Sequence, residues 1–313
     1  MRMRTVGRSG LRVSALALGT MGWGSEVDQD TATELLDAFR DAGGTLLDTA
    51  YGYGDGASEE ILGSLTASCR EELVLATKAG ISRTTGTRVV DTSRGTLLDQ
   101  LDASLRRLRT DHVDLWMVHA WGDNAPIEET VSAMAYAVSS GRARYVGVSN
   151  HNGWQLARMA TLLQAEGVPV VADQIEYSLV ARTADDDVLP AAEHLGSGIL
   201  AWAPLGGGVL TGKYRHGVPA DSRAAGGRHD NWARRRVDTG SGTIVDAVAT
   251  AAEGLRISPV QVALTWLRER PGIAAAVVGA RTPGQLRMAL GSDVIDLPDQ
   301  VRDALDEVSL HAE

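Results

Sequence analysis

The fold is decided by a strand–helix–strand unit at residues 113–150, VDLWMVHAWGDNAPIEETVSAMAYAVSSGRARYVGVSN. A short apolar run over Val113–Val118 predicts a buried strand. Apolar residues at helical spacing over Ile127–Val138 predict an amphipathic helix, and Tyr145–Val148 predicts a second strand. Short turns join the three segments, so the two strands are expected to be parallel and connected by a right-handed crossover.

The same unit recurs along nearly the whole chain. Further strands are predicted at Ala15–Gly19, Thr45–Thr49, Leu73–Thr77, Val170–Gln174, Ile199–Ala203 and Ala274–Val278. Further helices are predicted at Thr31–Arg40, Ser58–Leu65, Thr92–Leu108, Gln155–Leu163, Val188–Leu195, Thr243–Gly254, Pro259–Arg268, Pro283–Leu290 and Pro298–Val308. Eight strand–helix units in one continuous series predict an α/β fold of the (β/α)8 TIM-barrel type, which takes roughly 250 residues.

Visible additions account for the rest of the 313 residues. Arg2–Val13 predicts an N-terminal hairpin over the bottom of the barrel, and residues 211–240 form a long Gly- and Arg-rich loop after strand seven. Residues 1–313 are therefore expected to form a single barrel domain. The rival architecture, a doubly wound open sheet, would normally show a G-x-G-x-x-G motif after its first strand, and no glycine pair matches that spacing.

Composition excludes several classes of protein. The formal net charge of −10 argues against a nucleic-acid partner and against an anionic membrane surface. Cys69 is the only cysteine, which excludes an intramolecular disulfide and a multi-cysteine zinc site. No stretch approaches the roughly 20 apolar residues of a membrane span, and no apolar signal region follows the basic N-terminus. A cytoplasmic protein, either a monomer or a homo-oligomer, is expected.

Polar side chains stand at the ends of five successive predicted strands. In a (β/α)8 barrel the active site lies at the C-terminal ends of the strands. Asp48, Lys78 and His119 come at the ends of strands two, three and four, Ser149-Asn150 ends strand five, and Gln174 ends strand six. Each residue alone has a structural explanation, such as a turn cap or a satisfied buried histidine. Their joint placement favours a catalytic site.

The residue types at these positions predict acid catalysis on a carbonyl. Asp48 and Lys78 come from adjacent strands and can pair as ions. An ammonium near a phenol is expected to lower the pKa of Tyr53 from about 10 and to make it a general acid. His119 can orient a substrate oxygen. No nucleophile–base pair or metal cluster is evident, so no metal is expected, and a proton donor without a reductant implies hydride from a bound cofactor.

Several motifs together resemble the aldo-keto reductase superfamily, in its long-form bacterial type. They are Asp48-Thr49-Ala50-x-x-Tyr53-Gly54, Ser58-Glu59, Leu62-Gly63, Ala76-Thr77-Lys78, Asp114-Leu115-x-x-x-His119, Gly147-Val148-Ser149-Asn150, Ala201-Trp202-Ala203-Pro204-Leu205, Leu210-Thr211-Gly212-Lys213-Tyr214 and Gly279-Ala280-Arg281-Thr282. The resemblance covers roughly Leu11 to Leu290. Each motif alone is weak, but the set in this order is highly specific.

The resemblance implies an NADPH-dependent carbonyl reductase. Hydride would come from the nicotinamide and the proton from Tyr53. Lys78 and Asp48 would tune Tyr53 as the proton donor, and His119 would place the carbonyl of an aldehyde or ketone. The loop at 211–240 would cover the cofactor. The implied cofactor contacts are Thr20, Met21, Ser149, Asn150, Gln174, Trp202, Pro204, Leu205, Gly206, Gly208, Lys213, Gly279, Arg281 and Gln285.

The chain departs from the family pattern at three places. Trp202 stands where the family usually has a tyrosine stacked on the nicotinamide, and a tryptophan can stack as well. Ala203 stands where serine is common, so a hydroxyl contact to the pyrophosphate is missing. Met288-Ala289 replaces a Glu-Asn pair, so a preference for NADPH over NADH rests mainly on Arg281 and Gln285.

The substrate is left open by the sequence. Trp23, Tyr51 and Trp121 follow strands one, two and four and are predicted to line an apolar substrate pocket, with packing at the rim as the alternative. Two other functions fit the same motifs. One is a nicotinamide-sensing binding module like the channel-associated members of the superfamily, and the other is a reductase of nucleotide-linked keto-deoxysugars.

Lysine usage singles out two positions. Only Lys78 and Lys213 are lysine among the 30 basic residues, and the remainder are arginine. A compact ammonium whose pKa can shift suits the position of Lys78 better than a guanidinium, which is planar and always charged. Lys213 lies in the loop that the resemblance places near the pyrophosphate, where a point-charge contact is expected.

Overall fold

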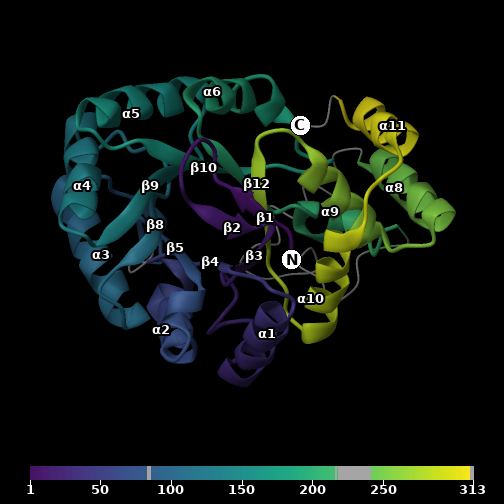
Figure 1. Ribbon diagram of the computed structural model, residues 1–313, viewed down its shortest axis with the longest axis horizontal. Helices are drawn as coiled ribbons and strands as arrows, with labels where there is room; N and C mark the ends of the chain where they lie inside the picture. The colour runs from purple at the N-terminus through teal and green to yellow at the C-terminus, as the bar shows by residue number, and fades with distance from the viewer. Residues whose placement is uncertain (83–85, 216, 218–240, 311–313) are drawn as a thin grey trace.

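Eight parallel strands close into a barrel with helices around it (Figure 1). The structure is a computed structural model that describes residues 1–82, 86–215, 217 and 241–310. The order around the barrel is β10-β11-β12-β3-β4-β5-β8-β9, which confirms the predicted (β/α)8 fold. The barrel strands are β3 (Leu16–Gly19), β4 (Leu46–Asp48), β5 (Val74–Ala79), β8 (Val113–Val118), β9 (Ala143–Ser149), β10 (Val170–Glu176), β11 (Gly198–Trp202) and β12 (Ile273–Val278).

The helices lie where the sequence pattern predicts them. They are α1 (Gln29–Asp41), α2 (Ala57–Thr66), α3 (Arg94–Leu108), α4 (Ile127–Ser139), α5 (Gly153–Ala165), α6 (Val188–Leu195), α8 (Gly242–Leu255), α9 (Pro259–Glu269), α10 (Pro283–Leu290) and α11 (Asp299–Ser309). Local capping explains several of the starts. Asn152 and Ser258 each exchange hydrogen bonds with a glutamine three residues later, which satisfies backbone N–H groups at the first turn of α5 and α9.

In the described part of the chain, four short strands lie outside the barrel and form two hairpins. They are β1 (Met3–Thr5) with β2 (Arg12–Ser14), and β6 (Ile81–Ser82) with β7 (Val89–Val90). The second hairpin was not predicted, because its strands are too short to show a periodic pattern. Of the predicted loop at 211–240, residues 216 and 218–240 lie outside the described residues.

The β1–β2 hairpin covers the bottom of the barrel, as predicted (Figure 1). The Arg4 guanidinium donates to the carbonyl of Ile273 at 2.8 Å, and the Arg8 backbone N–H donates to the carbonyl of Gly196 at 2.8 Å. Both acceptors lie at or just before the N-terminal ends of strands β12 and β11. Gly7 has φ 55° and a Cβ there would collide with backbone, so this close approach requires glycine.

Buried apolar side chains form a packed core inside the barrel, and the buried polar side chains of Asp48, Lys78 and Gln174 lie toward the C-terminal ends of their strands. Buried apolar residues fill its lower and middle levels, among them Ala17, Leu46, Leu115, Met117 and Leu200. A second, larger cluster fills the layer between the strands and the helices. Among the described residues, no helix combines the length and the apolar character that crossing a membrane requires.

Candidate active site

Asp48 and Lys78 form a buried ion pair at the mouth of the barrel. Asp48 is the last residue of β4, and Lys78 lies near the end of the neighbouring strand β5. The Lys78 ammonium donates to both carboxylate oxygens of Asp48, at 2.8 and 2.9 Å, and to the carbonyl of Thr49 at 2.8 Å. Lys78 is 0% and Asp48 is 3% exposed, so the ammonium is held entirely by protein groups.

The surroundings of Lys78 keep it charged. Burial lowers the pKa of Lys78 because the ammonium loses its hydration, but the Asp48 carboxylate and the Tyr53 hydroxyl raise it and prevail. The net direction is upward. Lys78 is therefore a fixed positive charge beside any group that lies within its reach.

Tyr53 and His119 complete a cluster of the four predicted catalytic side chains. Tyr53 begins a 3-10 helix, η1 (Tyr53–Gly56), in the turn after β4. The Lys78 ammonium donates to the Tyr53 hydroxyl at 3.4 Å. His119 follows β8 directly, and its ring lies edge-on to the Tyr53 ring, with 5.7 Å between centroids and an angle of 77°. Four separate segments thus bring their side chains to one point.

The predicted lowering of the Tyr53 pKa is wrong in direction. Burial raises the pKa of the hydroxyl above its usual value, and the Lys78 ammonium, which acts in the opposite direction, does not offset it. The nearby Asp48 carboxylate adds to the rise. Tyr53 is therefore protonated around neutral pH, which is the form that a proton donor needs.

A hydrogen-bonded network joins the ends of β8, β9 and β11. The Trp202 indole N–H donates to Asn150 Oδ1 at 3.0 Å, and Asn150 Nδ2 donates to the His119 carbonyl at 3.0 Å and to Ser149 Oγ at 3.0 Å. The Ser149 hydroxyl donates to the Gln174 carbonyl at 2.9 Å. Asn150, Ser149 and Trp202 are among the predicted cofactor residues, and the network fixes the orientation of the indole.

Gln174 links this side of the mouth to the ion pair. Its Nε2 donates to Asp48 Oδ1 at 2.7 Å, so the Asp48 carboxylate accepts three hydrogen bonds from the described residues. Within the described part of the chain, Gln174 Oε1 has no protein partner. It is free to accept a hydrogen bond from a bound molecule, as the predicted contact to a nicotinamide carboxamide requires.

Two non-glycine residues at the mouth have left-handed backbone. Asn150 has φ 57° directly after β9, and Ala203 has φ 51° directly after β11. Such residues cost conformational energy and concentrate at functional sites. Ala203 lies at the position where the family commonly has serine, so the bend is present although the hydroxyl is not.

A turn of three glycines follows β11. Gly206, Gly207 and Gly208 have φ values of 55°, 68° and 96° within the 3-10 helix η4 (Gly206–Thr211). The exposed Lys213 ammonium lies against Gly208 and 5.0 Å above the Tyr214 ring. Without side chains on the glycines, backbone N–H groups and an ammonium can approach a phosphate closely. Pro204 and Leu205, also predicted contacts, lead into this turn.

The remaining predicted cofactor residues divide between the rim and the interior. Arg281 and Gln285 lie at the start of α10, where the Arg281 backbone N–H donates to Gln285 Oε1 at 3.0 Å. Gly279 is exposed beside them, and Met21 is half-buried. Thr20, by contrast, is buried, and its hydroxyl contacts Asp48 O and Ser58 Oγ. Thr20 therefore supports the end of β4 from the neighbouring end of β3.

The three predicted substrate residues lie in different environments. Trp23 is 1% exposed and packs in the core, and the Tyr51 ring lies under the Arg107 guanidinium of α3 at 4.6 Å. Both positions favour packing over substrate contact. Trp121 is half-buried at the rim, where its ring meets those of His151 and Trp154 at 5.6 and 5.0 Å. The sequence pattern did not indicate Trp154, which is 57% exposed and lies in the first turn of α5.

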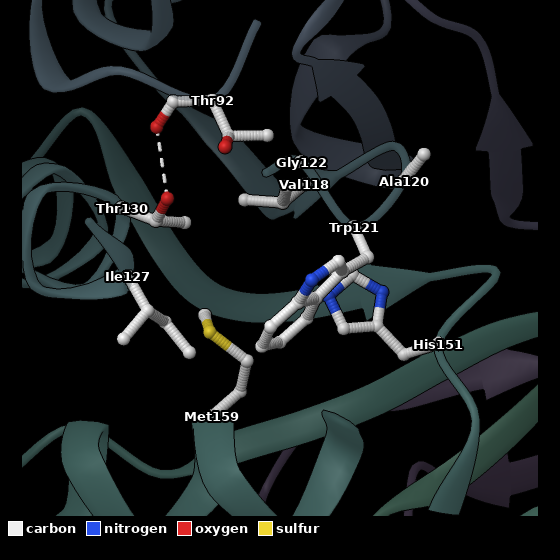
Figure 2. A pocket seen from close by; sticks show the side chains of 9 residues that line it. All are labelled: Thr92, Val118, Ala120, Trp121, Gly122, Ile127, Thr130, His151 and Met159. Atoms are coloured by element: carbon white, nitrogen blue, oxygen red, sulfur yellow. Dashed lines mark hydrogen bonds between the residues drawn. The ribbon is translucent and has the colours of Figure 1, made fainter. Parts of the chain in front are cut away.

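A small cavity lies behind Trp121, between the end of β8 and helices α4 and α5 (Figure 2). Figure 2 shows the Trp121 and His151 rings on one side of it, with Met159 and Ile127 facing them. Its volume of about 10 Å³ is enough for one water molecule and excludes a substrate. Burial lowers the pKa of His151 to about 4, so its ring is neutral and donates from Nδ1 to the Ser149 carbonyl at 2.9 Å.

Comparison with known proteins gives one consistent result. The family model described as "Aldo/keto reductase family" matches residues 15–310. An uncharacterized oxidoreductase of Bacillus subtilis is 35% identical over 97% of this chain and 94% of its own length. L-glyceraldehyde 3-phosphate reductase of Escherichia coli K12 is 34% identical over 91% of this chain and 86% of its own length. A probable voltage-gated potassium channel subunit beta of rice is 35% identical over 91% of this chain and 89% of its own length.

Proposed function

The chain belongs to the aldo/keto reductase family of oxidoreductases, and from that premise we propose that it is an NADPH-dependent reductase of aldehydes or ketones. The observation that carries the proposal is the Lys78 ammonium, which is held by Asp48 at 2.8 and 2.9 Å and lies 3.4 Å from a protonated tyrosine. This arrangement can give a proton to a carbonyl oxygen and stabilise the phenolate that results.

The proton transfer follows from the charges at the mouth. A carbonyl that accepts hydride gains negative charge on its oxygen, and Tyr53 donates a proton to that oxygen. The raised pKa of Tyr53 keeps the proton in place until charge develops on the substrate. Lys78 then stabilises the phenolate through the contact at 3.4 Å. His119, edge-on to Tyr53, is placed to orient the carbonyl from the other side.

The residues present fit a nicotinamide dinucleotide, which the family generally uses. When bound, the cofactor supplies the hydride. Gln174 Oε1 is available for the carboxamide, and the Trp202 indole is held in one orientation for stacking by Asn150. The glycine turn with Lys213 suits the pyrophosphate. Arg281 and Gln285, at the start of α10, suit the 2′-phosphate that distinguishes NADPH from NADH.

Replacing the acid tests the proposal. Tyr53→Phe is expected to lower kcat on an activated aldehyde by about 10²–10⁴-fold, because the proton donor is lost. The variant should still bind NADPH, measured by quenching of tryptophan fluorescence. Tyr136→Phe, on an exposed tyrosine of α4, is the matched control and should retain full turnover. Undiminished turnover by Tyr53→Phe would refute the mechanism. The substrate panel should include small aldehydes with and without a phosphate group, since one relative is named for such a substrate.

A second candidate is a nicotinamide-sensing module, because one similar protein is described as a potassium channel subunit beta. The two candidates differ in turnover and not in binding. Tight NADPH binding with negligible reduction across a broad carbonyl panel would favour the sensor. Multiple turnovers with any aldehyde at a rate above the Tyr53→Phe variant would favour the reductase.

A further inference from the structure

The turn that carries Tyr53 has an unfavourable backbone conformation. Gly54, Asp55 and Gly56 all have positive φ, at 57°, 54° and 106°. Asp55 is not a glycine, so its left-handed conformation is costly. Among the described residues, no side chain forms a capping hydrogen bond at Gly52, the start of η1. The turn therefore needs contacts from outside to stay in this conformation.

Arg107 of helix α3 supplies those contacts at both ends of the turn. Its Nη1 donates to the Tyr51 carbonyl at 3.1 Å, and its guanidinium lies 4.6 Å above the Tyr51 ring. At the other end it lies so close to Gly56 that a Cβ there would collide with the guanidinium. Tyr53 lies between these two points.

Arg107 is itself fixed by a buried carboxylate. Nη1 pairs with Glu59 Oε2 of helix α2 at 3.2 Å, and Glu59 is 0% exposed. The other carboxylate oxygen, Oε1, accepts a hydrogen bond from the Thr77 hydroxyl at 2.6 Å. Thr77 directly precedes Lys78 in β5. A continuous set of polar contacts thus joins the strand that carries Lys78 to the turn that carries Tyr53.

We propose that Arg107 is a positioning residue for the reaction, which holds the turn at residues 51–56 so that the Tyr53 hydroxyl stays within reach of the Lys78 ammonium. This inference rests on the proposed function. Among the described residues, Arg107 makes its hydrogen bonds, ion pair and ring contact with Tyr51 and Glu59 and not with the four side chains of the proposed catalytic cluster, so it acts through the backbone of the turn. A misplacement of the acid by about 1 Å is enough to lower turnover up to about 10²-fold.

An arginine is needed for geometric reasons. The planar guanidinium can pair with Glu59, donate to the Tyr51 carbonyl and cover an aromatic ring at the same time. A lysine keeps the charge opposite Glu59 but offers a single point of contact. An alanine leaves the buried Glu59 carboxylate without its ion pair, and burial already raises the pKa of that group.

The test compares Arg107 with an arginine of similar environment at the other end of the barrel. Arg70 donates to the carbonyls of Leu73 and His112 at 3.0 and 3.1 Å and pairs with Asp114 at 2.8 Å. These partners lie at or before the N-terminal ends of β5 and β8. Arg107→Lys and Arg107→Ala would be measured beside Arg70→Lys and Arg70→Ala for kcat, for KM and for melting temperature.

A spectroscopic measurement makes the test independent of turnover. With only six tyrosines in the chain, labelling with ¹³Cζ-tyrosine gives a simple spectrum, and Tyr53→Phe assigns the Tyr53 signal. We expect Arg107→Ala to lower kcat about 10–100-fold with little change in cofactor KM, and to shift or broaden the Tyr53 signal. Arg107→Lys should recover part of both. The Arg70 variants should lower the melting temperature by a similar amount and leave kcat and the Tyr53 signal unchanged.

Two results would overturn the inference. One is an Arg107→Lys or Arg107→Ala protein with wild-type kcat and an unmoved Tyr53 signal. The other is a matching loss of kcat in the Arg70 variants, which would mean that any loss of stability has the same effect. If the wild-type protein reduces no carbonyl, the proposed function fails, and the Tyr53 signal alone still decides whether Arg107 positions the turn.

Discussion

Two buried carboxyl groups, Asp48 and Asp173, differ in the hydrogen-bond partners that the fold places around them. Asp48, at the end of β4, accepts two hydrogen bonds from Lys78 and one from Gln174. Asp173 precedes Gln174 in β10 and is 0% exposed. Neither of its oxygens has a hydrogen-bond partner of good geometry in the described part of the chain. Backbone N–H groups of His151 and Gln174 nevertheless lie near enough to offset part of the burial.

The difference follows from the alternation of side chains along a strand. Gln174 points into the barrel and reaches Asp48, so Asp173 points to the opposite face, toward the helices. Inside the mouth, polar groups from three strands converge and can satisfy a charge. The layer between strands and helices is apolar, and a carboxyl there keeps its proton. The fold thus stabilises the charged Asp48 carboxylate at the mouth, whereas the buried Asp173 carboxyl lowers the stability of the folded protein.

The largest effect is expected from removing the partner of Asp48. Lys78→Met leaves a buried carboxylate with one hydrogen bond in place of three, which should lower the free energy of unfolding by about 3–5 kcal/mol. Turnover should be lost as well. Urea unfolding at pH 7 measures the change, and adding Asp48→Leu should recover part of the stability because no buried charge remains. A loss below about 1 kcal/mol would mean that solvent reaches Asp48 and that the two carboxyls differ less than the structure indicates.

An intermediate effect of opposite sign is expected at Asp173. Burial raises the pKa of Asp173 well above its usual value. The folded protein therefore holds this proton more tightly than the unfolded chain does, and stability falls as the pH rises from about 4 through the folded-state pKa. Asp173→Asn cannot ionise and should be more stable than wild type by about 1–3 kcal/mol at high pH, with no gain near pH 4. Melting curves between pH 4 and pH 9 test this. A constant difference at all pH values would contradict the assignment.

The smallest effect is expected at Gln174, which follows Asp173 in β10 and donates a hydrogen bond to Asp48. Gln174→Leu removes one donor from Asp48 and leaves both hydrogen bonds from Lys78, so the free energy of unfolding should fall by only about 1 kcal/mol. The same variant should weaken cofactor binding several-fold, because it also removes Oε1. Urea unfolding and fluorescence titration with NADPH separate the two effects. A loss as large as that of Lys78→Met would show that Gln174 and not Lys78 is the main support of Asp48.

Much of the fold and of the candidate catalytic cluster could be predicted, because both follow from local sequence patterns. The run Val113–Val118 and the helix Val188–Leu195 have the predicted bounds, since apolar periodicity and turn residues define them without reference to the rest of the chain. Parallel strands in a barrel all end at the same face. Polar residues at strand ends, such as Asp48, Lys78 and His119, could therefore be placed together before any distance was known.

Other features depend on distances that no local pattern contains. Trp23 is predicted from its place after strand one to line the substrate pocket, and only the structure shows that its side chain is 1% exposed. Arg107 carries no signal of its own, because an arginine at the end of a helix is usually a solvated charge, and only the structure places it against Tyr51 and Glu59. Trp154 lies in helix α5, and only the structure shows that its ring contacts Trp121, which follows β8.

By itself, the sequence determined the barrel, the family and the identity of the four side chains at the mouth, because periodicity and residue type are properties of short segments. Only the tertiary structure decided the direction of the shift in the Tyr53 pKa, which is raised where residue types alone predicted a lowering. The reason is physical. A pKa is set by the balance between lost hydration and nearby charge, and both depend on how deeply separate segments bury one another. The same holds for Asp48 and Asp173, which are alike as residues and differ only in what the fold places around them.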